Sequence, residues 1–291
     1  MFSIVRAFGR RHPKLCAPFR PVWQQVNRLL WVLRSKMFSR WPITFEAGRY
    51  VVSMVTEGQI AECVWRGTFE EPERNFAARE IKPGMRVLNI GANAGLYTII
   101  ASKLVGPAGM VHAFEPSSQN FALLKKNIEL NGCANVIANN LALSNLRGRL
   151  SLNCDPRHPG LDGHFHVRPL TEIPVDAVAP IEIVSCTTLD EYWRDASGGE
   201  IGPIDFIIID VEGAELSVFQ GALQTIAASP NLAMIMECCS DDSQIAALLG
   251  GFDFNYFQLD LDSSRLLPAE IGQGSLVALR VSRAANPEIL S

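Results

Sequence analysis

A short apolar segment that leads into a glycine-containing turn constrains the fold of this chain more than any other feature. Residues 86–95 read RVLNIGANAG, and the next six, LYTIIA, have the composition of a helix start. A strand, a glycine turn and a helix in this order bring backbone N–H groups and a helix N-terminus to one place, where polar or anionic ligand groups can be held. The segment therefore predicts a cofactor cradle at the end of a sheet strand.

Apolar strands and helical patterns alternate after this turn. We expect helices over 95–105, 118–131, 214–228 and 240–249, and further strands over 110–115, 136–143, 204–210, 231–237, 252–258 and 275–281. This alternation predicts an α/β fold with a mostly parallel, doubly wound sheet covered on both faces. Residues 144–203 exceed a simple crossover and are expected to be an insertion that selects the substrate, with added strands near 150–152 and 181–184.

The N-terminal part is predicted to be an extension of this domain. Residues 1–49 form a basic arm, with an amphipathic helix over 22–38 because apolar residues recur at steps of three and four. Residues 50–83 are expected to hold a hairpin of strands 50–55 and 60–65 and a short helix over 73–80. The main domain then spans 84–291.

Charge is distributed unevenly along the chain. Residues 1–49 carry ten Lys and Arg against one acid, Glu46, which leaves 16 basic and 29 acidic residues beyond. The acidic main domain argues against nucleic acid as a partner, because phosphate contacts need a basic surface. Residues 1–40 admit three interpretations: a helix docked on the main domain, a peripheral contact with an anionic membrane, or a targeting segment.

Cysteine usage indicates the cellular compartment. The seven cysteines contain no CxxC pair, so neither a disulfide framework nor a zinc site is indicated, and a reducing cytoplasm is expected. No apolar run reaches the roughly 18 residues that a membrane-spanning helix needs. We therefore predict a cytoplasmic protein, with membrane association through 1–40 left open. The sequence does not indicate an oligomeric state.

The glycine turn discriminates between cofactors. A dinucleotide site requires G-x-G-x-x-G, but here Asn93 and Leu96 stand in place of the second and third glycines and would crowd a pyrophosphate. S-adenosylmethionine has no phosphate and is compatible with a looser turn. Its ribose diol needs a carboxylate acceptor, and Glu115 stands 20 residues after Gly95 at the end of the next strand.

Five motifs together resemble the FkbM family of S-adenosylmethionine-dependent methyltransferases. They are, in chain order, VLNIGANAGLYT at 87–98, HAFEP at 112–116, NIELNG at 127–132, TLD at 188–190 and IDVEGAE at 209–215. The resemblance implies a Rossmann-like class I methyltransferase fold and methylation of a hydroxyl on a sugar, glycan or natural product. The family usually has Asp where Asn89 stands and Lys where Ile208 stands, so a methyltransferase-like binding or scaffold protein is the alternative.

Site residues follow from the motifs and from the strand ends. We assign cofactor binding to Asn89, Gly91, Ala92, Asn93, Gly95, Tyr97, Thr98, Glu115, Pro116 and Ala142. We assign the chemistry to carboxylates at the ends of two strands that should be neighbours, namely Asp210, Glu212 and Glu237. Asp210 and Glu237 could also share a divalent cation, but no His stands at a suitable spacing and we expect no resident metal. His158, His164 and His166 are alternative bases.

Overall fold

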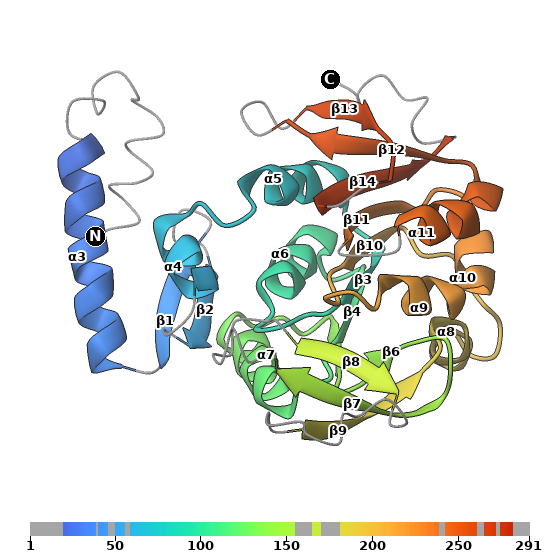
Figure 1. The fold of residues 1–291 in the computed structure, drawn as a ribbon, viewed down its shortest axis with the longest axis horizontal. Coiled ribbons are helices and arrows are strands. Elements are labelled where there is room, and N and C mark those ends of the chain that lie inside the picture. Colours follow the sequence, from blue (N-terminus) through green and yellow to red (C-terminus); the bar gives the residue numbers. More distant parts are fainter. Residues whose placement is uncertain are drawn as a thin grey trace.

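The computed structural model describes residues 20–38, 40–45, 50–55, 59–154, 165–169, 181–238, 242–260, 265–271 and 274–281. A central sheet has strand order β13-β12-β14-β11-β10-β3-β4-β5 (Figure 1). Its strands are β3 (Arg86–Ile90), β4 (Met110–Phe114), β5 (Val136–Asn139), β10 (Phe206–Ile209), β11 (Ala233–Cys238), β12 (Phe254–Leu259), β13 (Leu266–Ala269) and β14 (Gly274–Arg280). The five strands from β5 to β11 pair in parallel, whereas β14, β12 and β13 pair antiparallel with their neighbours. The predicted mostly parallel sheet is confirmed.

Helices cover both faces of this sheet. They are α5 (Glu71–Glu80), α6 (Leu96–Val105), α7 (Ser118–Leu130), α8 (Leu189–Ala196), α9 (Glu215–Gln220), α10 (Leu223–Ala227) and α11 (Asp242–Leu249), with a 3₁₀ turn, η4 (Gly250–Phe252). Successive residues of a strand point to opposite faces. Ile207 and Ile209 of β10 accordingly join the core beneath α8 to α11, whereas Phe206 and Ile208 join the core beneath α5 and α6.

The expected hairpin is placed wrongly in the sequence-based prediction. Strand β2 (Tyr50–Val55) pairs antiparallel with β1 (Arg40–Phe45), and the segment predicted as its partner forms helix α4 (Gln59–Arg66). Ala61, Val64 and Trp65 are buried, a spacing of three and four residues that gives a helix one apolar face. A strand would instead have placed Glu62 on the same face as Val64. Thr56 to Gly58 lie outside the described residues.

Two predicted elements are each interrupted in the structure. The strand over 136–143 ends at Asn139, and β6 (Ala142–Leu143) joins a second sheet, because the Asn140 amide donates to the carbonyls of Glu115 and Pro116 and turns the chain. The helix over 214–228 divides into α9 and α10 around Gly221. A Cβ on Gly221 would lie 2.1 Å from the Ser144 carbonyl oxygen, so the close approach of this loop requires glycine there.

The insertion over 144–203 forms a second sheet together with β6. Its order is β6-β9-β7-β8, with β7 (Gly148–Cys154), β8 (Phe165–Pro169) and β9 (Ile181–Thr187), which includes both strands expected there. His158 and His164 lie outside the described residues. Helix α8, which the sequence-based prediction does not include, follows this sheet. Thr188 caps it by accepting from the Glu191 N–H at 3.1 Å, a Thr-x-x-Glu signal that begins in the TLD motif and ends one residue beyond it.

The N-terminal hairpin is attached to α7 by two asparagines. The Asn127 amide accepts from the Ser53 N–H at 2.7 Å and donates to the carbonyls of Ser53 and Ala94. Asn131 forms the equivalent pair with Val51. Because Asn127 also donates to the glycine turn, the NIELNG motif joins the N-terminal hairpin of β1 and β2 to that turn.

Helix α3 (Arg20–Met37) lies at the outer edge of the molecule, beyond α4 (Figure 1). It contacts α4 through aromatic and cationic side chains: the Trp31 and Trp65 rings are 6.3 Å apart, and the Arg34 guanidinium lies 4.4 Å from the Trp65 ring centroid. The predicted amphipathic helix is thus present. Among the described helices, none combines the length and apolar character needed to cross a bilayer.

Candidate functional site

The glycine turn after β3 is shaped by close backbone packing. Gly91 has φ +85°, and a Cβ at this position would lie 1.8 Å from the carbonyl oxygen of Asp210. The N–H groups of Gly91 and Ala92 both donate to the Phe114 carbonyl, at 3.0 and 2.8 Å. Asn93 also adopts a left-handed conformation, with φ 48°. The turn therefore fits between the ends of β4 and β10, where only glycine can stand at position 91.

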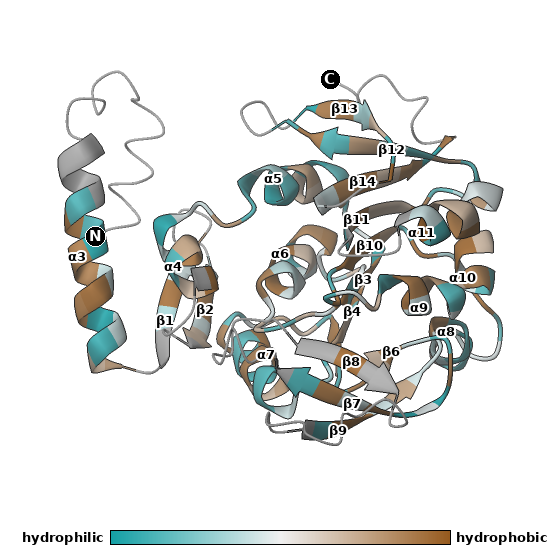
Figure 2. Ribbon diagram, in the orientation of Figure 1, coloured by the Kyte–Doolittle hydropathy of each residue, from teal (hydrophilic) through white to brown (hydrophobic). Residues whose placement is uncertain are grey.

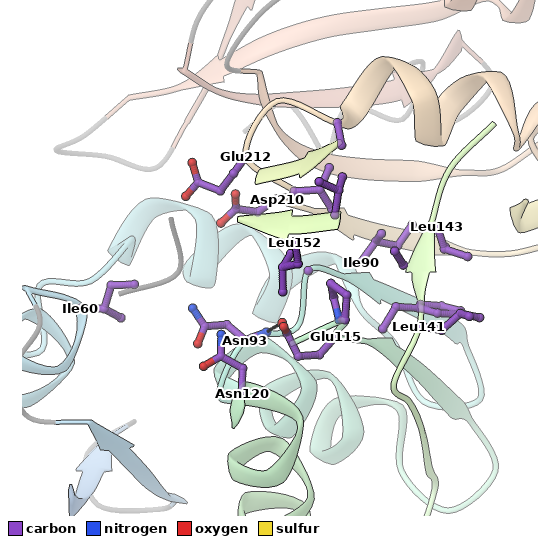
Figure 3. A pocket seen from close by; sticks show the side chains of 17 residues that line it. Ile60, Ile90, Asn93, Glu115, Asn120, Leu141, Leu143, Leu152, Asp210 and Glu212 are labelled. Carbon is purple, nitrogen blue, oxygen red and sulfur yellow. Dashed lines mark hydrogen bonds between the residues drawn. The ribbon is translucent and has the colours of Figure 1, made fainter. Parts of the chain in front are cut away.

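Glu115 joins the turn to the end of β4. Its two carboxylate oxygens accept from the backbone N–H groups of Asn93, at 2.7 Å (Figure 3), and of Ser117, at 2.9 Å. The side chain is only 5% exposed, and burial raises its pKa to about 7 although these hydrogen bonds oppose the shift. The Asn120 side chain also hydrogen-bonds to Glu115, and since a carboxylate has about four acceptor positions, room remains for a further donor.

A first cavity opens beside Glu115. Four of the predicted cofactor residues line it, Gly91, Asn93, Pro116 and Ala142, together with Glu115 itself. Its apolar walls include Phe114, Leu141, Leu143, Leu152 and Val167. Asp210 and Glu212 stand across the cavity from Asn93 and Glu115 (Figure 3). The insertion contributes Leu152 and Val167, which the sequence alone did not indicate.

A second cavity adjoins the first on the other side of the glycine turn. Gly91, Asn93 and Asp210 line both cavities, and so does Ile60 of α4. The second cavity also contains Glu70, Tyr97 and Glu237. Tyr97 donates to Glu70 at 2.7 Å, and burial raises the pKa of Glu70 to about 7.

No sequence pattern assigns Glu70 to the site. It precedes α5 in a left-handed conformation, with φ 40°, in a segment that carries no recognisable motif. The only local signal is Pro72 near a helix start, which locates the helix but assigns no role to the carboxylate.

Asn89 and Thr98 form a buried pair. The Asn89 amide donates to the Thr98 hydroxyl at 2.9 Å, and Asn89 is 3% exposed. Asn89 and Ile208 line the second cavity, as do Ala92 and Tyr97. Thr98 and Gly95 line neither cavity. Thr98 accepts the Asn89 hydrogen bond from outside the cavities. Gly95 allows α7 to pack closely against the turn, because a Cβ at this position would lie 2.6 Å from Leu124 Cδ1.

Asp210 lies where the two cavities meet. Asp210 follows β10, and the parallel pairing of β10 with β11 places Ile209 opposite Met236. The next residues of the two strands, Asp210 and Glu237, are therefore neighbours. The Oδ1 atom of Asp210 is buried and has no hydrogen-bond partner among the described residues. Burial, followed by the charges of Glu237 and Glu212, raises the pKa of Asp210 well above its usual value.

The loop after Asp210 is closed by Glu215. This fully buried side chain accepts from the N–H groups of Val211 and Gly213, at 3.3 and 3.1 Å. Glu212 adopts φ 52° and lines the first cavity only. Of the three acids in the IDVEGAE motif, the buried Glu215 therefore shapes the loop, while Asp210 and Glu212 line the cavities. No set of three His, Cys, Asp or Glu suited to a metal ion occurs in the part of the chain that the structure describes.

Comparison with known proteins identifies the family. The profile of the Methyltransferase FkbM domain matches residues 89–258, more than half of the chain. This chain belongs to the FkbM methyltransferase family. Both the suspected resemblance and the Rossmann-like class I methyltransferase fold are confirmed. A search of curated proteins finds no match.

Solved structures similar to this FkbM methyltransferase share little sequence with it. An O-methyltransferase from Thermotoga maritima is 12% identical, with 83% of this chain and 77% of that chain covered and a TM-score of 0.43. An rRNA methylase from Streptococcus thermophilus is 14% identical (71% and 91% covered, TM-score 0.38). A SAM-dependent methyltransferase from Aquifex aeolicus is 15% identical (72% and 87% covered, TM-score 0.38).

The residues present fit S-adenosylmethionine. The turn at Gly91 lets the backbone approach a ligand closely, Glu115 keeps an acceptor position for a diol, and the apolar walls of the first cavity suit an aromatic base. The Glu70 carboxylate in the second cavity complements a cationic group.

Proposed function

We propose that this FkbM methyltransferase transfers the methyl group of S-adenosylmethionine to a hydroxyl of a sugar, glycan or natural product. The observation that carries the proposal is the position of Asp210 at the junction of two cavities, with Oδ1 buried and free of partners among the described residues. Methyl transfer needs an acceptor held in line with the sulfur–carbon bond, and a hydroxyl acceptor must also lose its proton. A carboxylate between cofactor and acceptor meets the second requirement.

In this proposal the first cavity binds the nucleoside part of the cofactor. Glu115 accepts from the ribose hydroxyls, while Pro116 and Ala142 flank the base. Asn89, Ala92 and Tyr97 border the methionyl part in the second cavity. When bound, the cofactor supplies an electrophilic methyl group on a sulfonium.

Asp210 acts as the general base. The acceptor oxygen forms a bond to the methyl carbon as the carbon–sulfur bond breaks; the sulfur keeps that electron pair, and the hydroxyl proton passes to an Asp210 oxygen. Glu237 and Glu212 raise the pKa of Asp210 through their negative charge, which makes it a stronger base once ionised. Both are positioning residues in this scheme.

A screen of hydroxylated acceptors tests the proposal. The protein is incubated with cofactor carrying a deuterated methyl group and with pools of sugars, glycans and hydroxylated natural products. Mass spectrometry should find the label in one acceptor class, and fragmentation should place it on oxygen. Label found on nitrogen or carbon, or in no acceptor although the cofactor binds, would contradict the proposal.

The runner-up function is a methyltransferase-like binding protein. It is favoured by the neutral residues at 89 and 208, since the Asn89 amide is committed to Thr98 and Ile208 presents an apolar side chain to the second cavity. Asn89→Asp discriminates between the two functions. Activity that appears only in the variant would favour the binding protein, whereas turnover by the natural sequence excludes it.

The partner and compartment are also inferred. We infer a small-molecule or glycan acceptor rather than a nucleic acid, on the acidic charge of residues 50–291. A reducing cytoplasm is supported by the free thiols of Cys63, Cys133 and Cys186.

A further inference from the structure

Helix α3 presents two different faces. The face toward the body contains Asn27 and Trp31, which are 7% and 5% exposed, and it contacts α4. The opposite face contains Val26, Leu29, Leu33 and Met37, spaced by three and four residues, so these side chains form one stripe. Their exposed fractions are 41%, 61%, 50% and 71%.

This stripe is larger than isolated surface leucines would produce. It runs from Val26 to Met37, about 16 Å of helix at about 1.5 Å per residue, and Figure 2 shows α3 alternating between hydrophobic and hydrophilic segments at the edge of the molecule. Such contiguous apolar surface on a soluble domain marks an interaction site. None of the other described elements covers it.

Charge identifies the partner. Helix α3 contains four basic residues, Arg20, Arg28, Arg34 and Lys36, and no acidic residue. On a helical wheel Lys36 stands at one edge of the stripe and Arg28 farther round on the same side, while Arg34 stands beyond the other edge, where it lies over the Trp65 ring. An apolar stripe flanked by cations, without acids, is the pattern of a helix that lies in the interface of an anionic bilayer.

The charge of the whole chain favours the same orientation. Residues 1–49 hold ten basic residues and one acid, whereas the remainder carries a large acidic excess. An anionic surface attracts the first part and repels the second, so the outer edge with α3 turns toward the membrane. A second copy of the chain would instead place two cationic helices together, which is unfavourable.

We propose that the stripe of Val26, Leu29, Leu33 and Met37 docks peripherally on an anionic lipid bilayer. The helix lies parallel to the membrane plane, with the apolar side chains among the acyl chains and the flanking cations at the headgroups. Helix α4 then lies between the bilayer and both cavities, because Trp65 contacts α3 and Ile60 lines the cavities.

Vesicle co-sedimentation of the full chain tests this proposal. The probes are phosphatidylcholine vesicles with and without one quarter phosphatidylglycerol. The protein should sediment with the anionic vesicles and remain in solution with the neutral ones. Leu29→Ser with Leu33→Ser should weaken anionic-vesicle binding about tenfold or more. Arg28→Gln with Lys36→Gln should weaken it about 30-fold, because each basic residue near such a surface contributes about a factor of five.

A matched control separates the stripe from general hydrophobicity. Leu130 and Leu267 are 51% and 50% exposed on α7 and β13, so Leu130→Ser with Leu267→Ser removes similar apolar surface elsewhere and should leave binding unchanged. The proposal is overturned by equal binding to neutral vesicles, by absence of binding to both, or by equal loss in the control. A dimer in light scattering that Leu29→Ser with Leu33→Ser dissociates would also overturn it and assign the stripe to a second copy.

Discussion

Asp210 differs from Glu215 in what its buried, partnerless oxygen faces: Asp210 lines both cavities, whereas Glu215, whose Oε2 also lacks a partner among the described residues, lines neither. Glu115 and Glu215, by contrast, are held by backbone N–H groups. A carboxylate with an uncommitted oxygen beside a cavity is suited to take a proton from an acceptor, whereas one held by two backbone donors is suited to shape a loop or orient a ligand. Carboxylates in the same part of the fold therefore take different roles.

Substitution of Asp210 should separate chemistry from binding. Asp210→Asn keeps the shape but cannot accept the proton, so kcat should fall about 10²- to 10⁴-fold while cofactor affinity changes little. Because the base must be ionised and its pKa is raised, kcat of the natural protein should increase with pH. Steady-state kinetics across pH and calorimetry with the cofactor check both statements. An unchanged kcat would remove Asp210 from the mechanism.

Glu237 should act on the reaction only through Asp210. Glu237→Gln removes the charge that, after burial, does most to raise the pKa of Asp210, so the rising limb of the kcat profile should move to lower pH. Glu129→Gln changes an exposed carboxylate on α7 and serves as the control, with no shift expected. A loss of kcat at every pH without displacement of the limb would show a different role for Glu237.

At the scale of elements, the glycine turn can be tested by two matched glycines. Gly91 and Gly84 have nearly the same φ, +85° and +86°, but a Cβ at 91 meets the Asp210 carbonyl while nothing lies within 4 Å at 84. Gly84→Ala should cost about 1–2 kcal/mol of unfolding free energy from backbone strain alone. Gly91→Ala should cost at least about 2 kcal/mol more, since the end of β10 must move. Urea unfolding gives both values, and equal losses would contradict the close approach.

The elements also show what sequence patterns can predict. The parallel core was predictable because buried strands leave apolar runs and the strand-turn-helix unit leaves glycines. Helix α4 was not, since Ile60 to Trp65 fits both a strand and a helix over so few residues. The break at Gly221 depends on the Ser144 carbonyl, 77 residues away in the chain, and no local pattern records such a contact.

The candidate site divides in the same way. Glu115 and Asp210 were found because strand ends meet at one edge of a parallel sheet. Glu70 reaches the second cavity from outside the sheet, and Leu152 reaches the first from the insertion, so only tertiary structure brings them to the site. Thr98 belongs to the same motif as Asn89, but only Asn89 lines a cavity, while Thr98 hydrogen-bonds to it. A motif does not show which of its residues face the cavity.

For the whole molecule, burial of Glu115 predicts how stability depends on pH. A folded-state pKa of about 7 lies above the usual value of 4.5, so its contribution to stability is complete below pH 4.5 and is lost as pH rises through 7. The loss amounts to about 3 kcal/mol. Without cofactor, Tm should therefore decrease between about pH 4.5 and 7, level off above that range, and decrease less in Glu115→Gln. Scanning calorimetry of both proteins checks this, and parallel curves would contradict it.

In the proposed function, the two adjoining cavities bind S-adenosylmethionine through Glu115 and present it to Asp210. Calorimetric titration of the cofactor into the natural protein, Glu115→Ala and Asp210→Asn measures this most directly. We expect one site per chain, about tenfold or greater weakening in Glu115→Ala because hydrogen bonds to a charged acceptor are lost, and nearly unchanged affinity in Asp210→Asn. Absence of binding to the natural protein, or equal affinity in Glu115→Ala, would contradict it.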